Sequence, residues 1–203
     1  TSLVFPHIVD DARWWTGVVL HNPANATAQV ALSPHTDQAS ALDGRNATVA
    51  PGQSLTRIFS GLGLSPLTTW FQAESAHPLT GLELFATTEN KALAGLNTCT
   101  LPSTRGLLPK LEPGGLSWLG MANTSNATAG LTCQALNSDG HALANATRTL
   151  PPFGRLFLTP AELFPEQDLT NATHVLYGAD APLATFQING SPSGMMLDAL
   201  PGL

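Results

Sequence analysis

The sequence predicts an all-β protein with two tandem antiparallel β-sandwich domains that arose by internal duplication. The chain has 203 residues, enough for two domains of about 100 residues each. Three observations support this prediction. The two halves match, short apolar segments are bounded by turn residues, and only 11% of the residues are charged, against about 25% in ordinary soluble proteins.

The two halves of the chain resemble each other in the same order. NPANATAQVAL at 22–32 matches NTSNATAGLTC at 123–133, and AHPLTGLELF at 76–85 matches DAPLATFQIN at 180–189. Repeats at a nearly constant spacing are the signature of duplicated structural units.

We therefore predict one β-sandwich at residues 1–98 and a second at 99–203. The boundary falls in the stretch 97–106, which is rich in Thr, Ser, Pro and Gly.

Within each half the pattern is that of β-strands. TGVVLHN at 16–22 and TAQVALS at 27–33 are short, β-branched and bounded by turn residues. In 68–75 polar and apolar residues alternate, and in GLELF Glu83 points to the face opposite its leucine neighbours.

Turn residues and one helix start complete the elements. LDGR at 42–45 and SDGH at 138–141 place Asp-Gly at expected hairpin turns. A short helix is expected after Thr159, which caps it, with Pro160 at its first position and Glu162 three residues after the cap.

Charge and hydropathy exclude several classes of partner. The net charge is −6 and no basic stretch is present, so we expect no nucleic-acid binding. No apolar run reaches the roughly 18–20 residues that span a bilayer, so no membrane insertion is expected. The chain starts at Thr1 without a methionine, which favours an exported protein whose signal peptide has been removed. No cofactor is expected.

The chain has two cysteines, Cys99 and Cys133. In an exported protein they could form one disulfide, whereas two buried thiols acting as small apolar groups are the alternative.

Several segments resemble a tandem module of exported bacterial proteins. They are FPH, WWTGVVLHNPANATAQVAL, VAPGQS and WFQAESAHPLTGLELFATTENKALAGL. The resemblance covers both halves, and the second departs from it at Lys110, Thr124 and Asn189, where the module has His, Pro and an aromatic residue. It implies immunoglobulin-like β-sandwiches in a secreted, periplasmic or cell-surface protein, and it brings no catalytic signature.

Loop histidines and carboxylates are candidate metal ligands. His7 could act with Asp10 and Asp11, or His35 with Asp37, although no close pair of histidines is present. A solvated loop without metal is the alternative in both places.

Tryptophans are the candidate ligand-binding residues. Flat aromatic rings stack on sugars, so Trp14, Trp15 and Trp70 with Arg13 and Gln72 form a candidate site, whereas burial between the sheets is the commoner fate. Adjacent Trp14 and Trp15 on one strand point to opposite faces, so one of them is expected to face outward.

These features favour a non-catalytic extracellular module for adhesion, scaffolding or recognition at the bacterial cell surface, with an unidentified protein or glycan as its partner. A carbohydrate-binding module that uses the exposed tryptophans is the first alternative. A glycan-active hydrolase using Asp10, Asp11 and Glu74 is the second, and it would need two carboxylates about 5–9 Å apart.

The tripeptide Asn-Ala-Thr occurs five times, beginning at Asn25, Asn46, Asn126, Asn145 and Asn171. Each copy is formally an N-glycosylation acceptor. Because Asn25 and Asn126 fall at the same place in both halves, we interpret the tripeptide mainly as a turn that leads into a strand.

Overall fold

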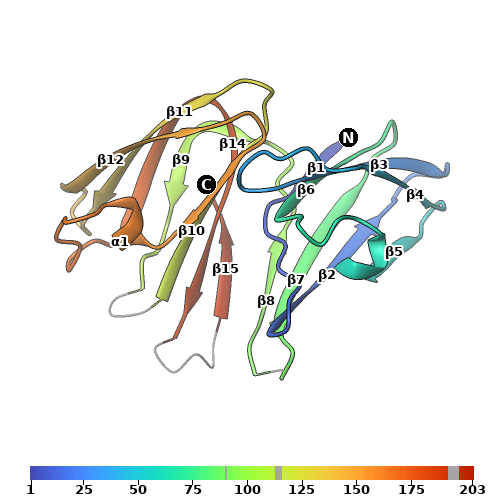
Figure 1. Ribbon diagram of the computed structural model, residues 1–203, viewed down its shortest axis with the longest axis horizontal. Helices are drawn as coiled ribbons and strands as arrows, with labels where there is room; N and C mark the ends of the chain where they lie inside the picture. Colours follow the sequence, from blue (N-terminus) through green and yellow to red (C-terminus); the bar gives the residue numbers. More distant parts are fainter. Residues whose placement is uncertain (90, 113–115, 192–196) are drawn as a thin grey trace. The chain divides into compact units, whose positions relative to one another are not determined.

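The computed structural model describes residues 1–89, 91–112, 116–191 and 197–203 (Figure 1), and within these ranges every strand pair is antiparallel. The chain forms two compact units. Unit 1 comprises Thr1–Thr36 and Ser40–Thr100, and unit 2 comprises Leu101–Leu203 with the short segment Asp37–Ala39. In the described residues no helix has the length and apolar character needed to cross a membrane.

Unit 1 contains two four-stranded sheets arranged like a sandwich, with the strand orders β1-β6-β3-β4 and β5-β2-β7-β8. A short 3-10 helix, Phe59–Leu62, follows the fifth strand. The strands are β1 (Ser2–Phe5), β2 (Trp14–His21), β3 (Ala28–His35), β4 (Arg45–Val49), β5 (Ser54–Ile58), β6 (Trp70–Glu74), β7 (Thr80–Thr87) and β8 (Leu93–Asn97).

The core of unit 1 contains apolar side chains from both sheets. Phe5 and Phe71 are fully buried, face each other across β1 and β6, and stack with ring centroids 4.3 Å apart. Val18 and Leu20 contribute from β2 of the other sheet. Along β2 and β3 the buried residues alternate with more exposed ones, as a two-residue period requires.

Unit 2 is one seven-stranded sheet that curls upon itself. The strands are β9 (Ser103–Leu108), β10 (Leu116–Asn123), β11 (Ala129–Leu136), β12 (Ala142–Leu150), β13 (Arg155–Leu158), β14 (His174–Gly190) and β15 (Leu197–Pro201). The predicted all-β antiparallel class is confirmed, but the second half does not consist of two separate sheets.

The long strand β14 is the reason for the single sheet. Its first half, through Ala179, pairs with β11 and β9, and its second half, from Leu183 onward, pairs with β10 and β15. In unit 1 the corresponding partners are shared between two strands, since β6 pairs with β1 and β3 while β7 pairs with β2 and β8. The segment 75–79 separates β6 from β7, whereas β14 runs on without a break.

The predicted strands at 16–22 and 27–33 are confirmed as β2 and β3. The predicted helix is α1 (Pro160–Leu163), and its capping box is present: the Thr159 hydroxyl accepts from the Glu162 N–H, and the Glu162 carboxylate accepts from the Thr159 N–H.

Only one of the two predicted Asp-Gly hairpin turns forms. At the second site Gly140 has a φ of 80° and Asn137 N–H donates to the His141 carbonyl at 3.0 Å. At the first site the prediction is wrong, because Asp43 and Gly44 lie outside any turn, directly before β4, and the turn falls at Asp37 and Gln38. The longer connection 36–44 removes the need for a two-residue turn.

A buried asparagine anchors the β2–β3 connection of unit 1. Asn22 is fully buried, and its side-chain amide donates to the carbonyls of Ala26 (2.8 Å) and Val49 (3.0 Å). Its Oδ1 accepts from the Ala24 N–H at 3.0 Å. With a longer contact to the Ala50 carbonyl, at 3.3 Å, one side chain thus binds four backbone groups.

Asn123 makes the matching set of hydrogen bonds in unit 2. It is also fully buried, donates to the carbonyls of Ala127 (2.7 Å) and Pro151 (3.0 Å), and accepts from the Ser125 N–H at 3.0 Å. The same turn is therefore held in the same way in both units.

The Asn-Ala-Thr tripeptide lies in a bend or turn that leads into a strand, as interpreted from the sequence, at three of its five copies, which begin at Asn25, Asn126 and Asn171. Asn25 and Asn126 lie in bends that lead into β3 and β11, and both are exposed, whereas Asn22 and Asn123 make the turn's buried hydrogen bonds. The other two copies, at Asn46 and Asn145, lie within β4 and β12 rather than in turns.

A second buried polar pair also recurs. Glu83 points to the face opposite Leu82 and Leu84, as predicted. Its side chain is fully buried, whereas the two leucines are half-buried. Its Oε1 accepts from the His7 N–H at 3.1 Å. Gln187 takes this place in unit 2, where it accepts from the Lys110 N–H at 3.2 Å and its amide donates to the Lys110 carbonyl.

Candidate functional site

Trp70 does not form part of a ligand site. It is fully buried, and its ring stacks on His35, which lies opposite it in β3, with ring centroids 4.3 Å apart. Because no part of the indole is open to solvent, the prediction that it stacks on a ligand is wrong. Gln72, two residues on, is half-buried and hydrogen-bonds to the His35 side chain.

The His35 stack makes unit 1 sensitive to acid. Burial lowers the pKa of His35 below its ordinary value of 6.5, and the hydrogen bond with Gln72 offsets part of that shift. The unfolded chain therefore takes up this proton at a higher pH than the folded chain. The contribution of neutral His35 is fully present above pH 6.5 and is lost as the pH falls through the lowered pKa.

We expect the free energy of unfolding of unit 1 to fall between pH 7.5 and 5. The substitution His35→Phe keeps a ring on Trp70 and should reduce this pH dependence, whereas His141→Phe, in an exposed turn, should leave it unchanged. Urea unfolding at several pH values, followed by hydrogen exchange of unit 1 peptides, measures the difference. Equal pH dependence in wild type and His35→Phe would contradict the assignment.

Trp14, Trp15 and Arg13 lie at the start of β2, and both tryptophans are half-buried while Arg13 is exposed. The Trp15 ring lies over Gly17, where a Cβ would come within 3.2 Å of it. Trp70 and Gln72 belong to the other sheet of unit 1. The five predicted residues therefore do not form one site on a common sheet face.

The structure does not bring His7, Asp10 and Asp11 together as a metal-binding group. Among the residues that the structure describes, no group of three or more His, Cys, Asp or Glu side chains could hold a metal ion. His7 is buried, Asp10 is half-buried, and Asp11 closes a local turn, since its Oδ1 accepts from the N–H groups of Arg13 (2.7 Å) and Trp14 (2.9 Å).

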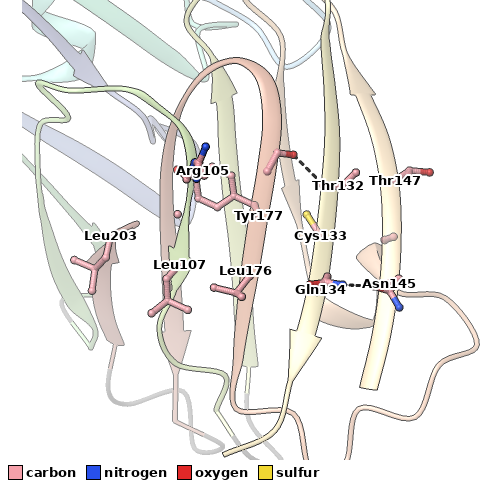
Figure 2. Close-up of a pocket in the computed structure, with 13 residues that line it drawn as sticks. Arg105, Leu107, Thr132, Cys133, Gln134, Asn145, Thr147, Leu176, Tyr177 and Leu203 are labelled. Carbon is pink, nitrogen blue, oxygen red and sulfur yellow. Dashed lines mark hydrogen bonds between the residues drawn. The ribbon is translucent and has the colours of Figure 1, made fainter. Parts of the chain in front are cut away.

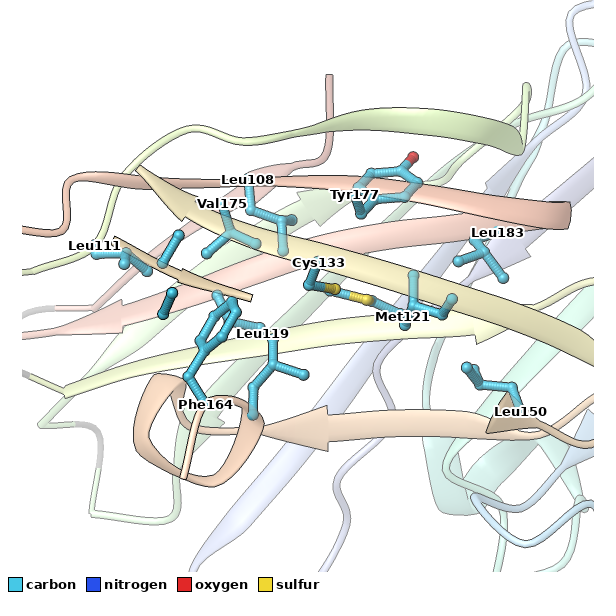
Figure 3. Packing of buried hydrophobic residues seen from close by; sticks show 14 of the residues in the cluster. Leu108, Leu111, Leu119, Met121, Cys133, Leu150, Phe164, Val175, Tyr177 and Leu183 are labelled. Atoms are coloured by element: carbon cyan, nitrogen blue, oxygen red, sulfur yellow. The ribbon is translucent and has the colours of Figure 1, made fainter. Parts of the chain in front are cut away.

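The structure describes Cys99 in unit 1 and Cys133 in unit 2 as thiols, and a disulfide between the two units stays a prediction. Cys133 points into the core of unit 2, beside Met121 and Leu119 (Figure 3). Burial raises the pKa of its thiol to about 12, so it remains protonated and behaves as a small apolar group.

A hollow lies on the outer face of unit 2, over β12, β11, the first half of β14, and β9 (Figure 2). It has a volume of about 840 Å³. The side chains that line it are the outward members of these strands, alternating with inward ones such as Cys133 and Tyr177 that belong to the core. Apart from Leu203, which follows β15, every lining residue belongs to one of these four paired strands.

Two rows of side chains cross the four strands. The first, here called the hydroxyl row, contains Thr147, Thr132, Gly178 and Arg105, which lie directly opposite one another from strand to strand. Thr132 donates its hydroxyl to the Gly178 carbonyl at 3.1 Å. Gly178 has no side chain, so the row has a gap between Thr132 and Arg105.

The second row, here called the amide row, contains Asn145, Gln134, Leu176 and Leu107. The Gln134 amide donates to Asn145 Oδ1 at 2.9 Å, which fixes both side chains relative to each other. Leu203 extends the row, because its backbone exchanges two hydrogen bonds with Leu107, of 2.7 and 2.9 Å. In the amide row the hydrogen-bonding groups thus lie on β12 and β11, and the leucines lie on β14 and β9.

Unit 1 has a hollow of about 780 Å³ at the same place in its own strand pairing. Its row contains Asn46, Ala31, Glu74 and Ser2, opposite one another on β4, β3, β6 and β1. The two units therefore present the same surface with different chemistry, with a carboxylate in unit 1 where unit 2 has a glycine.

Sequence reasoning did not identify this face. Its residues are ordinary outward members of alternating strands, and no local motif distinguishes Thr132 or Gln134 from other surface residues. These residues come together only through the register between paired strands, which the sequence alone does not give.

Comparison with known proteins gives only weak similarities. No family model matches the chain, and no curated protein matches it. The crystal structure of Thermotoga maritima 1070 matches with a TM-score of 0.41 and 15% identity, over 48% of this chain and 91% of that one. A β-glucuronidase from glycoside hydrolase family 2 matches with a TM-score of 0.21 and 9% identity, over 98% of this chain and 23% of that enzyme. Similarities at this level assign no activity to the chain.

Proposed function

We propose that this protein is a non-catalytic recognition module, exported to the bacterial cell surface, that binds its partner through the outer face of unit 2. The observation that carries this proposal is the hollow on that face. Amide, hydroxyl and guanidinium groups line it beside leucine side chains, and four paired strands hold them in place. Sites that bind small molecules or chain segments commonly combine an apolar surface with a few fixed polar groups.

An internal duplication of one β-sandwich unit is part of the proposal. The two units share the order of strand pairing, the buried asparagines Asn22 and Asn123, and the equivalent positions of Glu83 and Gln187. After such a duplication one face can keep a structural role while its copy acquires a ligand. The export of the protein is supported by its low charge content and by the resemblance of its segments to modules of exported proteins.

Blocking the hollow tests this function. Thr132→Tyr places a strand-compatible ring in the hydroxyl row, and Ala31→Tyr makes the same change at the equivalent position of unit 1. We expect a glycan and peptide array to give ligands whose binding falls at least about tenfold in Thr132→Tyr, about 1.4 kcal/mol. The matched variant Ala31→Tyr should bind like wild type. Ligands that bind Thr132→Tyr unchanged would contradict the proposal.

The half-exposed tryptophans of unit 1 support a second candidate, a carbohydrate-binding module centred on Trp14 or Trp15. In that case the array ligands would be lost in Trp15→Ala or Trp14→Ala and retained in Thr132→Tyr. Turnover of any array glycan would instead favour a hydrolase.

A further inference from the structure

We propose that the outer face of unit 2 binds an anionic oligosaccharide, with Arg105 recognising its carboxylate or sulfate group. This inference rests on the proposed function and names the ligand class of the same face. It depends on the open space beside Arg105, on the lining groups that remain available, and on the contrast with unit 1.

Arg105 stands beside an open space. Gly178 lies directly opposite it on β14, and a Cβ built on Gly178 would meet only the Thr132 hydroxyl oxygen, at 3.3 Å. In the described part of the chain the Arg105 guanidinium makes no ion pair. An arginine fork binds carboxylates and sulfates through two parallel N–H donors, and the gap at Gly178 leaves room for such a group.

Two other charged side chains near this row make hydrogen bonds with the backbone, and both keep their charge. Arg148, on β12, donates to the carbonyls of Glu162 (3.0 Å) and Leu163 (2.7 Å). Asp180, two residues beyond Gly178, accepts from the Gly130 N–H at 2.7 Å. Arg105 is the charged group within the hydroxyl row itself.

The remaining lining groups match sugar hydroxyls. After the hydrogen bond between Gln134 and Asn145, the Gln134 carbonyl and the Asn145 amide still offer an acceptor and donors. Thr147 adds an exposed hydroxyl, which both donates and accepts. Neighbouring strands lie about 4.8 Å apart, close to the length of one sugar ring, so successive rings can meet successive strands.

The leucines of the face suit the carbon-bound hydrogens of a sugar ring. Leu176 and Leu203 are both exposed there, and Leu107 lies between them. A peptide strand fits less well, because backbone groups in the sheet floor are used in the strand ladder and are not open to a second backbone.

Unit 1 provides the contrast. At the place of Gly178 it has Glu74, which fills the gap with a carboxylate, and at the place of Arg105 it has Ser2. This row would repel an anion. Because each residue is tolerated at its strand position in one unit, exchanging residues between the units gives variants that suit the fold.

Isothermal titration calorimetry on the full chain tests the proposal with three probes: a galacturonate trimer, a heparin tetrasaccharide and a neutral galactose trimer. We expect one of the two anionic probes to bind at one site per chain, more tightly at low salt, and the neutral probe to bind at least tenfold more weakly. The carboxylated and sulfated probes distinguish the two sources of the anion.

Exchange variants locate the site. We expect Arg105→Ser to weaken binding about 10- to 100-fold, as loss of charged hydrogen bonds does, and Gly178→Glu to abolish it. The double variant Ser2→Arg with Glu74→Gly should add a second site, raising the stoichiometry to two per chain. Circular dichroism confirms that each variant is folded.

Different results would refute the anionic ligand and the proposed recognition function. If neither anionic probe binds the folded chain, or if Arg105→Ser binds them unchanged, the anionic ligand is refuted. A neutral array ligand that is lost in Thr132→Tyr would then still support recognition by the same face.

Discussion

Replacing Asn123 by alanine is expected to lower the free energy of unfolding of unit 2 by about 3 kcal/mol, which would make it one of the most destabilising polar substitutions in the chain. The side chain is fully buried and makes three hydrogen bonds with backbone groups of Ser125, Ala127 and Pro151. Alanine would remove all three hydrogen bonds, and each is worth about 1 kcal/mol.

The chain offers a matched control three residues away. Asn126 belongs to the Asn-Ala-Thr tripeptide, is exposed, and its alanine variant should change stability by less than about 0.5 kcal/mol. The substitution Asn22→Ala should destabilise unit 1 to a similar extent as Asn123→Ala destabilises unit 2.

Urea unfolding followed by hydrogen exchange of peptides from each unit measures these effects separately. Equal effects of Asn123→Ala and Asn126→Ala would show that the buried amide does not hold the turn. If only Asn126→Ala lowered the free energy of unfolding of unit 2, the tripeptide rather than Asn123 would stabilise the turn.

Replacing Phe71 by alanine is expected to cost about 3–5 kcal/mol in unit 1. Phe71 is fully buried and stacks on Phe5 at 4.3 Å with an angle of 8° between the ring planes. The substitution removes the ring and leaves a cavity that the paired strands β1 and β6 cannot close by collapsing.

Glu74 on the same strand is the control. Its side chain is exposed on the opposite face, so Glu74→Ala should change the free energy of unfolding by less than about 0.5 kcal/mol. Thermal unfolding with hydrogen exchange of β6 peptides reports both variants. A cost below about 1 kcal/mol for Phe71→Ala would contradict the packing described for this core.

Much of the architecture could be predicted from the sequence, because strands and turns depend on residue patterns that are local in the chain. Alternation at 68–75 and 81–85, the β-branched segments at 16–22 and 27–33, and the capping residues at Thr159 and Glu162 all led to elements at those places. The antiparallel all-β class follows from the same short strands and turns.

What could not be predicted depends on long-range pairing. Nothing local in 174–190 shows that one strand passes through both halves of a sheet, since Pro182 would favour a break there. The burial of Glu83 and Trp70 likewise depends on residues distant in sequence, such as His7 and His35.

The candidate site was missed for the same reason. Sequence reasoning selected residues by chemical type, namely tryptophans, histidines and carboxylates. The outer face of unit 2 instead combines Thr132, Gln134 and Arg105, whose meaning comes from their register across β9, β11 and β14.

The most direct test of the proposed recognition face is a methyl-labelled NMR titration with an array ligand, in which leucine and threonine methyl groups and the tryptophan indole N–H groups are observed together. The proposal predicts shifts at Thr132, Thr147, Leu107 and Leu176, with the indole signals of Trp14 and Trp15 unchanged. Shifts confined to those two indoles, with the methyl groups of unit 2 unmoved, would contradict it.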